Sequence, residues 1–578
     1  FFQNKNNVFV KSNYCQGIHL TNGVMSNTVN FRSGTWQIIC TPTQFKTAFI
    51  SFGNNKFVLG QDIDFLGEDL ALSSPMNITT GGQLDGNGRT ISNFNYNYTG
   101  SNTGNGALFQ TINGDIENLR ITDANGVFDY GVNGGFGTGI LFGKVGASTT
   151  IKIKDIELEN VHMDIINNEG STFIERFGLV GGNYATSTGE AKNIKIKNSS
   201  ITLDGAGSSD IREVGAVFGR LEGTLRGVEV SGFTVYSESG NTLQKTSSLG
   251  GVVGKTNSVA TLNSIEVEGL NITIDHPAQA IGGVVGSLAE AMDFTSVNAE
   301  GTITLTDNTA NQVDIGGIAG IVTHGGTFNG ELINSRVSIA AFNGSFGASP
   351  VGGVFGKVTT TTAGNIRMTR YEGVIHGKSS CGGIIGSALG AGSIDYSSTR
   401  GTTTCDGGTS GGIVAGGGTF NISSVHSAMT VNSTSSSGAG GLVGSLGAAT
   451  VNNSYFEGVL SGANPATDGL LVGDCSACNV TNSYTSVSGA SQTAIGTANT
   501  IGTNSCALVD NGGTNTCMSY ANLANLNSNT SPTGGASAPS FAHINWELAG
   551  DGKYRQFSDK FFVRYIDNIG SAVKPFGL

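Results

Sequence analysis

Charged residues and proline are scarce in this sequence. Only 12% of its 578 residues are Asp, Glu, Lys or Arg, and only 8 are proline; about 25% charged residues is usual. Collagen needs frequent proline and a glycine at every third position, and disordered chains combine low hydrophobicity with high charge. A coiled coil would be rich in Ala, Glu, Lys, Leu and Arg. The composition excludes all three classes, and since 38% of the residues are apolar, we expect a folded core.

Basic residues are especially rare toward the C-terminus, where no Lys or Arg occurs between Arg400 and Lys553. The whole chain has 30 Lys and Arg against 42 Asp and Glu, which gives a net charge of −12. Binding to nucleic acid depends on clustered basic side chains that neutralise phosphates, so we expect no nucleic-acid partner. The sequence also lacks a run of about 18 apolar residues, and we expect no membrane span.

Glycine, in contrast, is abundant, and many of the 90 glycines recur in one short phrase. The phrase consists of two glycines, two apolar residues and a third glycine, as in Gly250–Gly254. Its copies end at positions 254, 286, 320, 356, 386, 415, 444 and 473, with Ala415 in place of the last glycine in one of them, and looser copies end at 143, 181 and 219. The last copies are 29 residues apart, and Asn453-Ser454-Tyr455 returns 29 residues later as Asn482-Ser483-Tyr484. A fixed period with like residues at like positions indicates stacked structural units.

The segments between these glycines alternate apolar and polar residues, as in Thr302–Thr306, which is typical of β-strands. Short strands with Gly, Asn and Asp turns in a repeat of 29 to 38 residues predict one coil of a β-solenoid. We therefore expect an all-β fold, a right-handed parallel β-helix of about twelve coils with a cap at each end. The adjacent apolar residues of the phrase cannot both point inward on a regular strand, so either a bend or a second apolar face is required.

Three regions are expected along the chain. Residues 1–56 would form an N-terminal arm and cap, residues 57–505 the solenoid, and residues 506–578 a C-terminal cap that is rich in aromatic residues. A helix beginning near Thr41 would cover the first coil and block edge-to-edge pairing. The first 35 residues are favoured as a disulfide-tied cap, and an arm that pairs with a neighbouring subunit is the alternative.

A second pattern lies near the N-terminus of the solenoid region. Asp62-Ile63-Asp64-Phe65 is followed by Leu84-Asp85-Gly86-Asn87-Gly88-Arg89-Thr90-Ile91-Ser92-Asn93, then by Ala107-Leu108-Phe109 and Ile116-Glu117-Asn118-Leu119. With the glycine phrases, this pattern resembles the GLUG-motif proteins, a bacterial group of secreted and surface β-solenoids. Leu84, Arg89 and Gln110 stand where that group usually has Phe, His and Gly.

The resemblance covers residues 57–485 and implies a parallel solenoid in an extracellular or cell-surface location on a bacterium. GLUG motifs occur in adhesins and as accessory domains of some peptidases. The chain contains no H-E-x-x-H motif, so a zinc peptidase activity of that kind is not expected here.

The cysteines number eight, and an even number in a Ser/Thr-rich chain of low charge favours disulfides and an oxidising compartment. The disulfide candidates are Cys15, Cys40, Cys381, Cys405, Cys475, Cys478, Cys506 and Cys517. Cys15–Cys40 and Cys381–Cys405 are the preferred pairs. The last four are left open: they form Cys475–Cys478 and Cys506–Cys517, pair between coils, or, as the less favoured alternative, bind zinc.

Two motifs suggest catalysis or phosphate binding but have the wrong context. Gly408-Thr409-Ser410-Gly411-Gly412 fits G-x-S-x-G, yet Ser410 occupies the repeat position held by Cys381 and Ala439 in neighbouring copies. Gly250–Thr256 ends like a phosphate loop but is one residue too short and lies within the repeat. Both are interpreted as parts of the solenoid.

The acidic residues include candidates for paired carboxylates and for cation ligands. The densest groups are Asp62 with Asp64, and a second set along one predicted strand. That set comprises Asp155, Glu157, Glu159 and Asp164. The alternation of the second set with Ile156 and Leu158 favours a solvated strand face over a glycosidase site. Calcium at Asp62, Asp64 or Asp85 is the weaker alternative to a turn role for Asp85-Gly86-Asn87-Gly88.

These observations predict a non-enzymatic, extracellular structural or adhesive protein with no cofactor. Its expected partners are further copies of itself, as in a filament, or surface glycans and proteins. A polar surface with few charges offers little repulsion against self-association. A carbohydrate-active β-helix enzyme and a monomeric glycan-binding module are the alternatives.

Overall fold

The structure is a computed structural model of the chain. It describes residues 15, 28–30, 35–48, 55–70, 76–100, 106–130, 136–146, 150–167, 173–205, 210–237, 245–257, 260–289, 292–306, 312–323, 331–343, 349–359, 362–434, 438–452, 454–456, 458–461, 468–481, 483–485, 493–498, 546–548 and 554–556.

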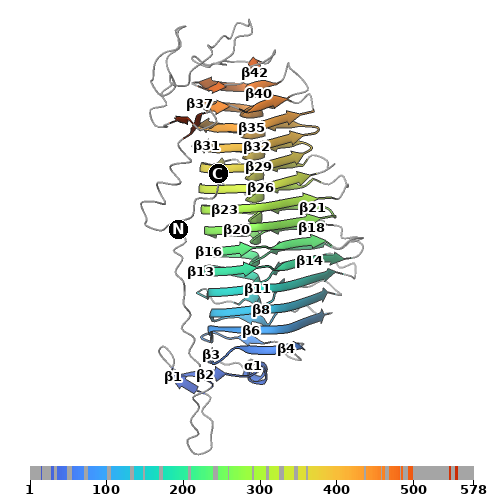
Figure 1. The fold of residues 1–578 in the computed structure, drawn as a ribbon, viewed down its shortest axis with the longest axis vertical. Coiled ribbons are helices and arrows are strands. Elements are labelled where there is room, and N and C mark those ends of the chain that lie inside the picture. The colour runs from blue at the N-terminus through green and yellow to red at the C-terminus, as the bar shows by residue number, and fades with distance from the viewer. Residues whose placement is uncertain are drawn as a thin grey trace, which may run out of the picture. The chain divides into compact units, whose positions relative to one another are not determined.

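The chain divides into two compact units, and each is described by itself. The N-terminal unit comprises Asn4–Glu290 and Ala299–Thr309, and the C-terminal unit comprises Phe1–Gln3, Ala291–Asn298 and Ala310–Leu578. Within each unit, parallel strands from successive coils stack in register (Figure 1). This arrangement confirms the parallel β-solenoid predicted from the repeat.

Each coil of the N-terminal unit contains a long strand or strand pair together with shorter strands. The long ones are β6 (Gln83–Gly100), β8 (Asp115–Tyr130), β11 (Lys152–Asn167), β13 (Gly181–Lys197), β14 (Ser200–Gly205), β16 (Phe218–Ser231), β17 (Thr234–Ser237) and β20 (Ala260–Ile274). The short ones are β5 (Asn77–Ile78), β7 (Phe109–Ile112), β9 (Phe136–Gly139), β10 (Phe142–Val145), β12 (Ile174–Gly178), β15 (Asp210–Gly215), β18 (Lys245–Gly250), β19 (Val253–Thr256), β21 (Ala278–Gly282) and β22 (Val285–Leu288). Strand β23 (Met292–Leu305) has residues in both units.

The C-terminal unit repeats the same order of elements. Its strands are β24 (Asp314–Gly316), β25 (Ala319–Val322), β26 (Glu331–Asn343), β27 (Pro350–Gly352), β28 (Phe355–Val358), β29 (Thr362–Gly377), β30 (Ser380–Gly382), β31 (Ile385–Asp395), β32 (Ser398–Cys405), β33 (Thr409–Gly411), β34 (Val414–Ser423), β35 (His426–Ser433), β36 (Ala439–Gly440), β37 (Val443–Asn452), β38 (Tyr455–Phe456), β39 (Val459–Ser461), β40 (Gly469–Thr481), β41 (Tyr484–Thr485) and β42 (Thr493–Ala498). Strands β43 (Trp546–Leu548) and β44 (Tyr554–Gln556) pair antiparallel.

The glycine phrase forms a bend so tight that backbone packs on backbone. A Cβ atom added to Gly440 would lie 1.8 Å from the Val443 carbonyl oxygen, inside the same bend. At Gly441 it would lie 2.2 Å from the Leu470 oxygen of the next coil, and at Gly444 2.5 Å from the Ala415 oxygen of the preceding coil. The contact at Gly440 lies within the bend itself, which explains why glycine recurs at this first position of every copy, whereas Leu470 and Ala415 hold the equivalents of Gly441 and Gly444 in neighbouring copies.

This bend also resolves how two adjacent apolar residues reach the core. Strand β36 ends at Gly440, the chain bends at Gly441 and Leu442, and β37 begins at Val443. Because the strand direction changes between them, Leu442 and Val443 are both fully buried. Of the two solutions left open by the sequence, the structure uses the bend.

The serine of the recurring Asn-Ser-Tyr phrase lies at a hydrogen-bonded corner. The Ser454 hydroxyl donates to the Asn452 carbonyl at 2.8 Å and accepts the Val425 N–H of the preceding coil at 3.3 Å. The Ser454 N–H in turn donates to the Ser483 hydroxyl of the following coil at 3.2 Å. Each buried serine therefore joins neighbouring coils at a point where the strand ladder is interrupted, and this satisfies buried polar groups.

A short helix covers the first coils, as the sequence predicts. The helix α1 (Pro42–Ala48) begins after Thr41, whose hydroxyl accepts the Gln44 N–H at 3.1 Å. Proline at the first helical position and a threonine cap are favourable start signals. Phe45 is fully buried and its ring packs on Phe65 with centroids 5.8 Å apart.

The remaining predictions for the ends are described only in part. Strand β2 (Thr35–Ile39) pairs antiparallel with β1 (Thr28–Asn30) and parallel with β3 (Lys56–Leu59). This pairing places the described part of the N-terminal region against the chain's own first coil. The rest of the predicted arm, and all of the predicted C-terminal cap except β43 and β44, lie outside the described residues.

Candidate functional site

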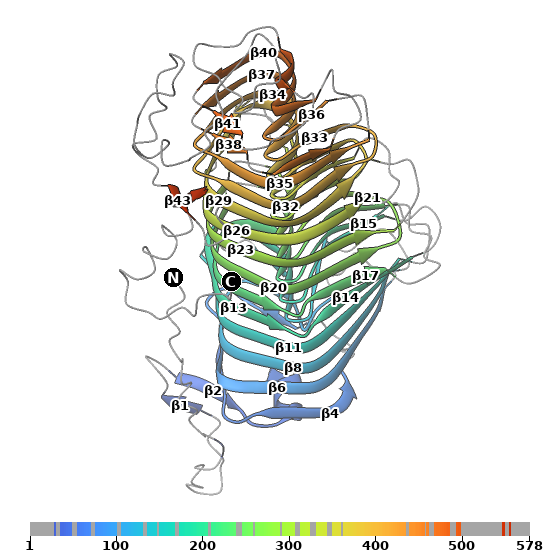
Figure 2. The same ribbon diagram turned by 45° about the horizontal axis from the view of Figure 1, so that its top comes forward.

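Left-handed residues form a ladder along one bend of the N-terminal unit. Asn93, Asp123, Asn160 and Asn198 have φ values of 55°, 54°, 55° and 46°, and they lie at equivalent positions of successive coils. Asn and Asp adopt this conformation more readily than other side chains that have a Cβ. Figure 2 shows that β8 and β11 bend along their length. We call these four residues, with Asp64 of β4 (Ile63–Asp69), the asparagine ladder.

A polar groove with a volume of about 800 Å³ follows this bend. Its residues come from β4, β6, β8, β11 and the junction between β13 and β14. They are Leu66, Gly67, Asn93, Asn95, Asp123, Asn125, Asn160, His162 and Asn198. We call this feature the asparagine groove. It crosses successive coils, so it is elongated in the stacking direction.

Hydrogen bonds between coils hold the amides of the groove in place. The Asn93 amide donates to Asp64 at 3.0 Å, and the Asn160 amide donates to Asp123 at 3.1 Å. A second row, two residues further along each strand, contains Asn95 and Asn125. The Asn95 amide donates to the Gly67 carbonyl at 2.9 Å, and the Asn125 amide donates to Asn95 at 3.3 Å. The groove is therefore preorganised before any ligand arrives.

Further features of the site are an aspartate with a lowered pKa, an oriented histidine and an exposed apolar side chain. The Leu66 backbone N–H, and then the Asn93 amide, lower the pKa of the Asp64 carboxyl by bonding to its charged form. His162 Nδ1 lies 2.8 Å from the Ser200 hydroxyl, which orients the exposed imidazole ring. Leu66 is 85% exposed at the rim of the groove. Its side chain offers an apolar contact beside the amides.

The second group of acidic residues singled out from the sequence lies at two different places along β11. In β11, Asp155, Glu157 and Glu159 lie before the bend at Asn160, and Asp164 lies beyond it. Glu157 pairs with Lys197 at 2.9 Å, and Glu159 pairs with Arg120 of the preceding coil. The first three therefore form an ion-paired strand face, and Asp164 does not converge with them.

The alternative of a calcium site at Asp62, Asp64 or Asp85 gains no support from the geometry. Asp85 is fully buried, and one carboxylate oxygen accepts the Asn87 N–H at 2.7 Å and the Asn118 amide at 3.1 Å. With Asn87 at φ 52°, this arrangement is an Asx-type turn, the role expected for Asp85. Among the residues that the structure describes, no cluster of three or more His, Cys, Asp or Glu side chains could hold a metal ion.

The two motifs interpreted as parts of the solenoid lie where the repeat places them. Ser410 is fully buried in β33 and is paired in register with Cys381 on one side and Ala439 on the other. Gly250–Thr256 runs from the end of β18 through a bend into β19. Neither segment leads into a helix, so neither has the strand-turn-helix geometry of a nucleophile elbow or a phosphate loop.

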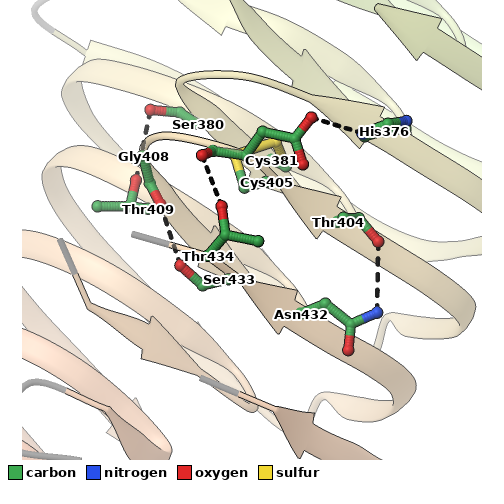
Figure 3. The surroundings of a disulfide bond; sticks show 11 residues. His376, Ser380, Cys381, Thr404, Cys405, Gly408, Thr409, Asn432, Ser433 and Thr434 are labelled. Carbon is green, nitrogen blue, oxygen red and sulfur yellow. Dashed lines mark hydrogen bonds and ion pairs between the residues drawn. A yellow bond between two sulfur atoms is a disulfide. The ribbon is translucent and has the colours of Figure 1, made fainter. Parts of the chain in front are cut away.

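Six of the eight cysteine candidates form three disulfides. Cys15 is joined to Cys40, and Cys381 to Cys405, as the sequence favoured. The second bond links β30 to the end of β32 in the next coil (Figure 3). Close to it, His376 bonds Asp406 at 2.8 Å, and Thr409 donates to Ser380 at 3.3 Å.

The third disulfide settles the pairing of two of the last four cysteines. Cys475 and Cys478 are joined within β40, where their register partners in the preceding coil are Leu446 and Ala449. The zinc alternative is wrong, because two of its four thiolates are consumed in this bond. Cys506 and Cys517 lie outside the described residues.

The asparagine groove was missed in the sequence, although a signal for it exists. The ladder positions 93, 123, 160 and 198 are separated by 30, 37 and 38 residues, close to the spacing of the glycine phrases. Asn or Asp at each position is the residue type that a left-handed bend prefers. Searching for Asn and Asp at the coil period would have found the ladder.

Comparisons with known proteins leave the function open. No protein-family model matches the chain, and no curated protein matches it. Among solved structures, a "putative immunoglobulin A1 protease" of Bacteroides ovatus is similar at 18% identity, with a TM-score of 0.33. The match covers 51% of this chain and 86% of that one. A likeness at this level carries no argument about activity.

Within the described residues, no helix is both long enough and apolar enough to cross a membrane.

Proposed function

We propose that the chain is a non-enzymatic, extracellular adhesive protein that holds a polysaccharide of a bacterial surface or matrix in the asparagine groove. The observation that carries the proposal is the groove itself, where exposed polar side chains from successive coils are fixed by hydrogen bonds between coils. Strand stacking repeats these groups at intervals of about 4.8 Å. A regular, elongated array of this kind suits a polymer with repeated hydroxyl groups.

The chemistry of the groove favours binding over cleavage. Glycosidases hold two carboxyl groups on either side of the bond that they break. Of the described residues that line the groove, Asp123 alone carries a carboxylate. Three disulfides support a location in an oxidising compartment. The resemblance of the repeats to GLUG-motif proteins supports a place among bacterial surface solenoids.

Depletion from solution by insoluble polysaccharides tests this proposal. We expect the purified full chain to be removed by at least one insoluble polysaccharide and to release no soluble sugar from it. The release of reducing ends or of unsaturated products would assign the chain to the alternative class of β-helix enzymes. Failure to bind any polymer in a panel that includes neutral, amino and acidic polysaccharides would remove the groove as a glycan site.

Self-association is a second candidate function, supported by an uncharged column of outward side chains in the C-terminal unit. This column contains Val374, Thr402, Thr430 and Val459. Val374 and Val459 are 40% and 56% exposed. Such a column has little electrostatic repulsion to oppose contact with a second copy.

Electron microscopy across a concentration series tests self-association. We expect ordered filaments with a regular repeat if the chain is a polymer subunit, and their appearance should depend on protein concentration. Separate particles at every concentration would contradict the filament function and leave the adhesive one in place.

A further inference from the structure

The side-chain amide hydrogen bonds between coils in the asparagine groove all have the same direction. Each of them uses one amide N–H donor of a groove asparagine. In each described bond, an amide N–H of one coil points toward an oxygen of the preceding coil. Asn93, Asn95, Asn125 and Asn160 each spend one of their two N–H groups in this way. The carbonyl oxygens and the Asp123 carboxylate, which has about four acceptor positions, keep most of their capacity. The groove is therefore richer in acceptors than in donors.

The charges around the groove also favour a ligand that brings hydrogen-bond donors rather than acceptors. Among the described residues that line it there is no lysine and no arginine, whereas Asp123 is exposed. Among the basic residues that precede the bend on these coils are Arg120 and Lys197. Arg120 pairs with Glu159, and Lys197 pairs with Glu157 at 2.9 Å, so both cations are already balanced by carboxylates. Among the described residues that line the groove, Asp123 is the one acidic group and His162 the one basic group.

We infer that the asparagine groove selects an amino-sugar oligosaccharide, whose hydroxyl groups donate to the amide oxygens and whose protonated amine pairs with Asp123. This inference rests on the proposed function and names its ligand class. A charge-assisted N–H bond to a carboxylate is stronger than a neutral one. The exposed side chain of Leu66 offers a contact for the apolar face of a sugar ring. Acidic polysaccharides are disfavoured because Asp123 repels their carboxylates or sulfates.

The chain offers a matched control for Asp123 at another bend of the same unit. Asp155 has the same φ of 54° and likewise accepts an amide from the next coil, Asn193, at 2.6 Å. Asp155 is not among the residues that line the groove. Replacing either aspartate by asparagine removes the same formal charge and keeps a residue type that tolerates the left-handed conformation.

Calorimetric titration of the full chain with soluble oligomers of glucosamine, N-acetylglucosamine and glucose tests the inference. The buffer should keep the glucosamine amines protonated. We expect glucosamine oligomers to bind about tenfold or more tightly than glucose oligomers, with a preference that falls as salt is added. Asp123→Asn should abolish that preference, and Asp155→Asn should retain it.

The outcomes separate this inference from the proposed function. If neutral oligomers bind as tightly as glucosamine oligomers, or if Asp123→Asn changes nothing, the ligand class is wrong but the groove remains a glycan site. Equal losses in Asp123→Asn and Asp155→Asn would show that only the net charge of the protein matters, which also overturns the inference. Absence of binding by every oligomer and every insoluble polysaccharide would overturn the proposed function itself.

Discussion

Replacing Gly440 by alanine is expected to unfold the coils around β36 and β37. The added Cβ would lie 1.8 Å from the Val443 oxygen, 2.6 Å from the Val443 carbonyl carbon and 2.8 Å from the Gly473 nitrogen. All three are backbone atoms, so no side-chain rotation relieves the clash. Overpacking usually costs 1–3 kcal/mol, and because the backbone itself must move here, we expect a loss of about 4 kcal/mol or more.

Hydrogen exchange followed by mass spectrometry would locate this effect. Peptides that cover β36, β37 and β40 should lose protection, whereas the N-terminal unit should keep it, because repeat structures depend mainly on nearest neighbours. Gly447→Ala in the same coil is the control, since its nearest backbone oxygens would lie 3.8 Å from the new Cβ. We expect a change within about 0.5 kcal/mol for Gly447→Ala. Equal protection in the two variants would show that the backbone contact at Gly440 is not limiting.

The solenoid was predictable because its strongest constraint is steric and local. At the first glycine of the bend, backbone meets backbone, so glycine recurs at this position in every copy of the phrase, from Gly139 to Gly469. The buried serine of Asn453-Ser454-Tyr455 is similar, since its hydroxyl bonds both its own strand and the neighbouring coil. When every coil must satisfy the same constraint, the residues that satisfy it recur in the sequence at the period of the coil.

The asparagine groove was not predictable in the same way, because it depends on how unequal coils align. The coil lengths differ between ladder positions, and register shifts between Asp64 and Glu68 and between Asp85 and Arg89 realign the strands. Which Asn and Asp side chains share one exposed bend is fixed only after these shifts. The sequence indicates which residues adopt the left-handed conformation, but it does not indicate on which face of the solenoid their side chains lie.

The asparagine ladder shows how a structural requirement also produces a chemical surface. A bend of the strand demands a left-handed residue, and Asn and Asp satisfy that demand with a polar side chain. Stacking then places those polar groups side by side, where they bond between coils and leave oxygens exposed. In the two coils that follow Asn198, the equivalent positions are held by Gly232 and Gly269. These glycines adopt the same left-handed conformation without a side chain. The choice of Asn or Asp over Gly is thus what distinguishes the coils that form the groove.

Removal of the disulfide between Cys381 and Cys405 is expected to destabilise the C-terminal unit by about 3.5 kcal/mol, because its 24-residue separation closes a long loop in the unfolded chain. Alanine is a suitable replacement at position 381, since Ala439 occupies the equivalent position two coils further on. Both cysteines are fully buried. The double variant Cys381→Ala/Cys405→Ala therefore removes the covalent link between adjacent coils with little change in polarity.

The short disulfide in β40 supplies the comparison. Cys475 and Cys478 are separated by 3 residues, so the same loop-closure argument gives them only about 2 kcal/mol. Cys475→Leu/Cys478→Ala copies Leu446 and Ala449 of the preceding coil, which keeps that corner filled. Denaturant unfolding without reductant should show the larger fall in midpoint for the Cys381/Cys405 variant. The reverse order would mean that packing at each corner, rather than the length of chain that the bond closes, determines what a disulfide contributes to this solenoid.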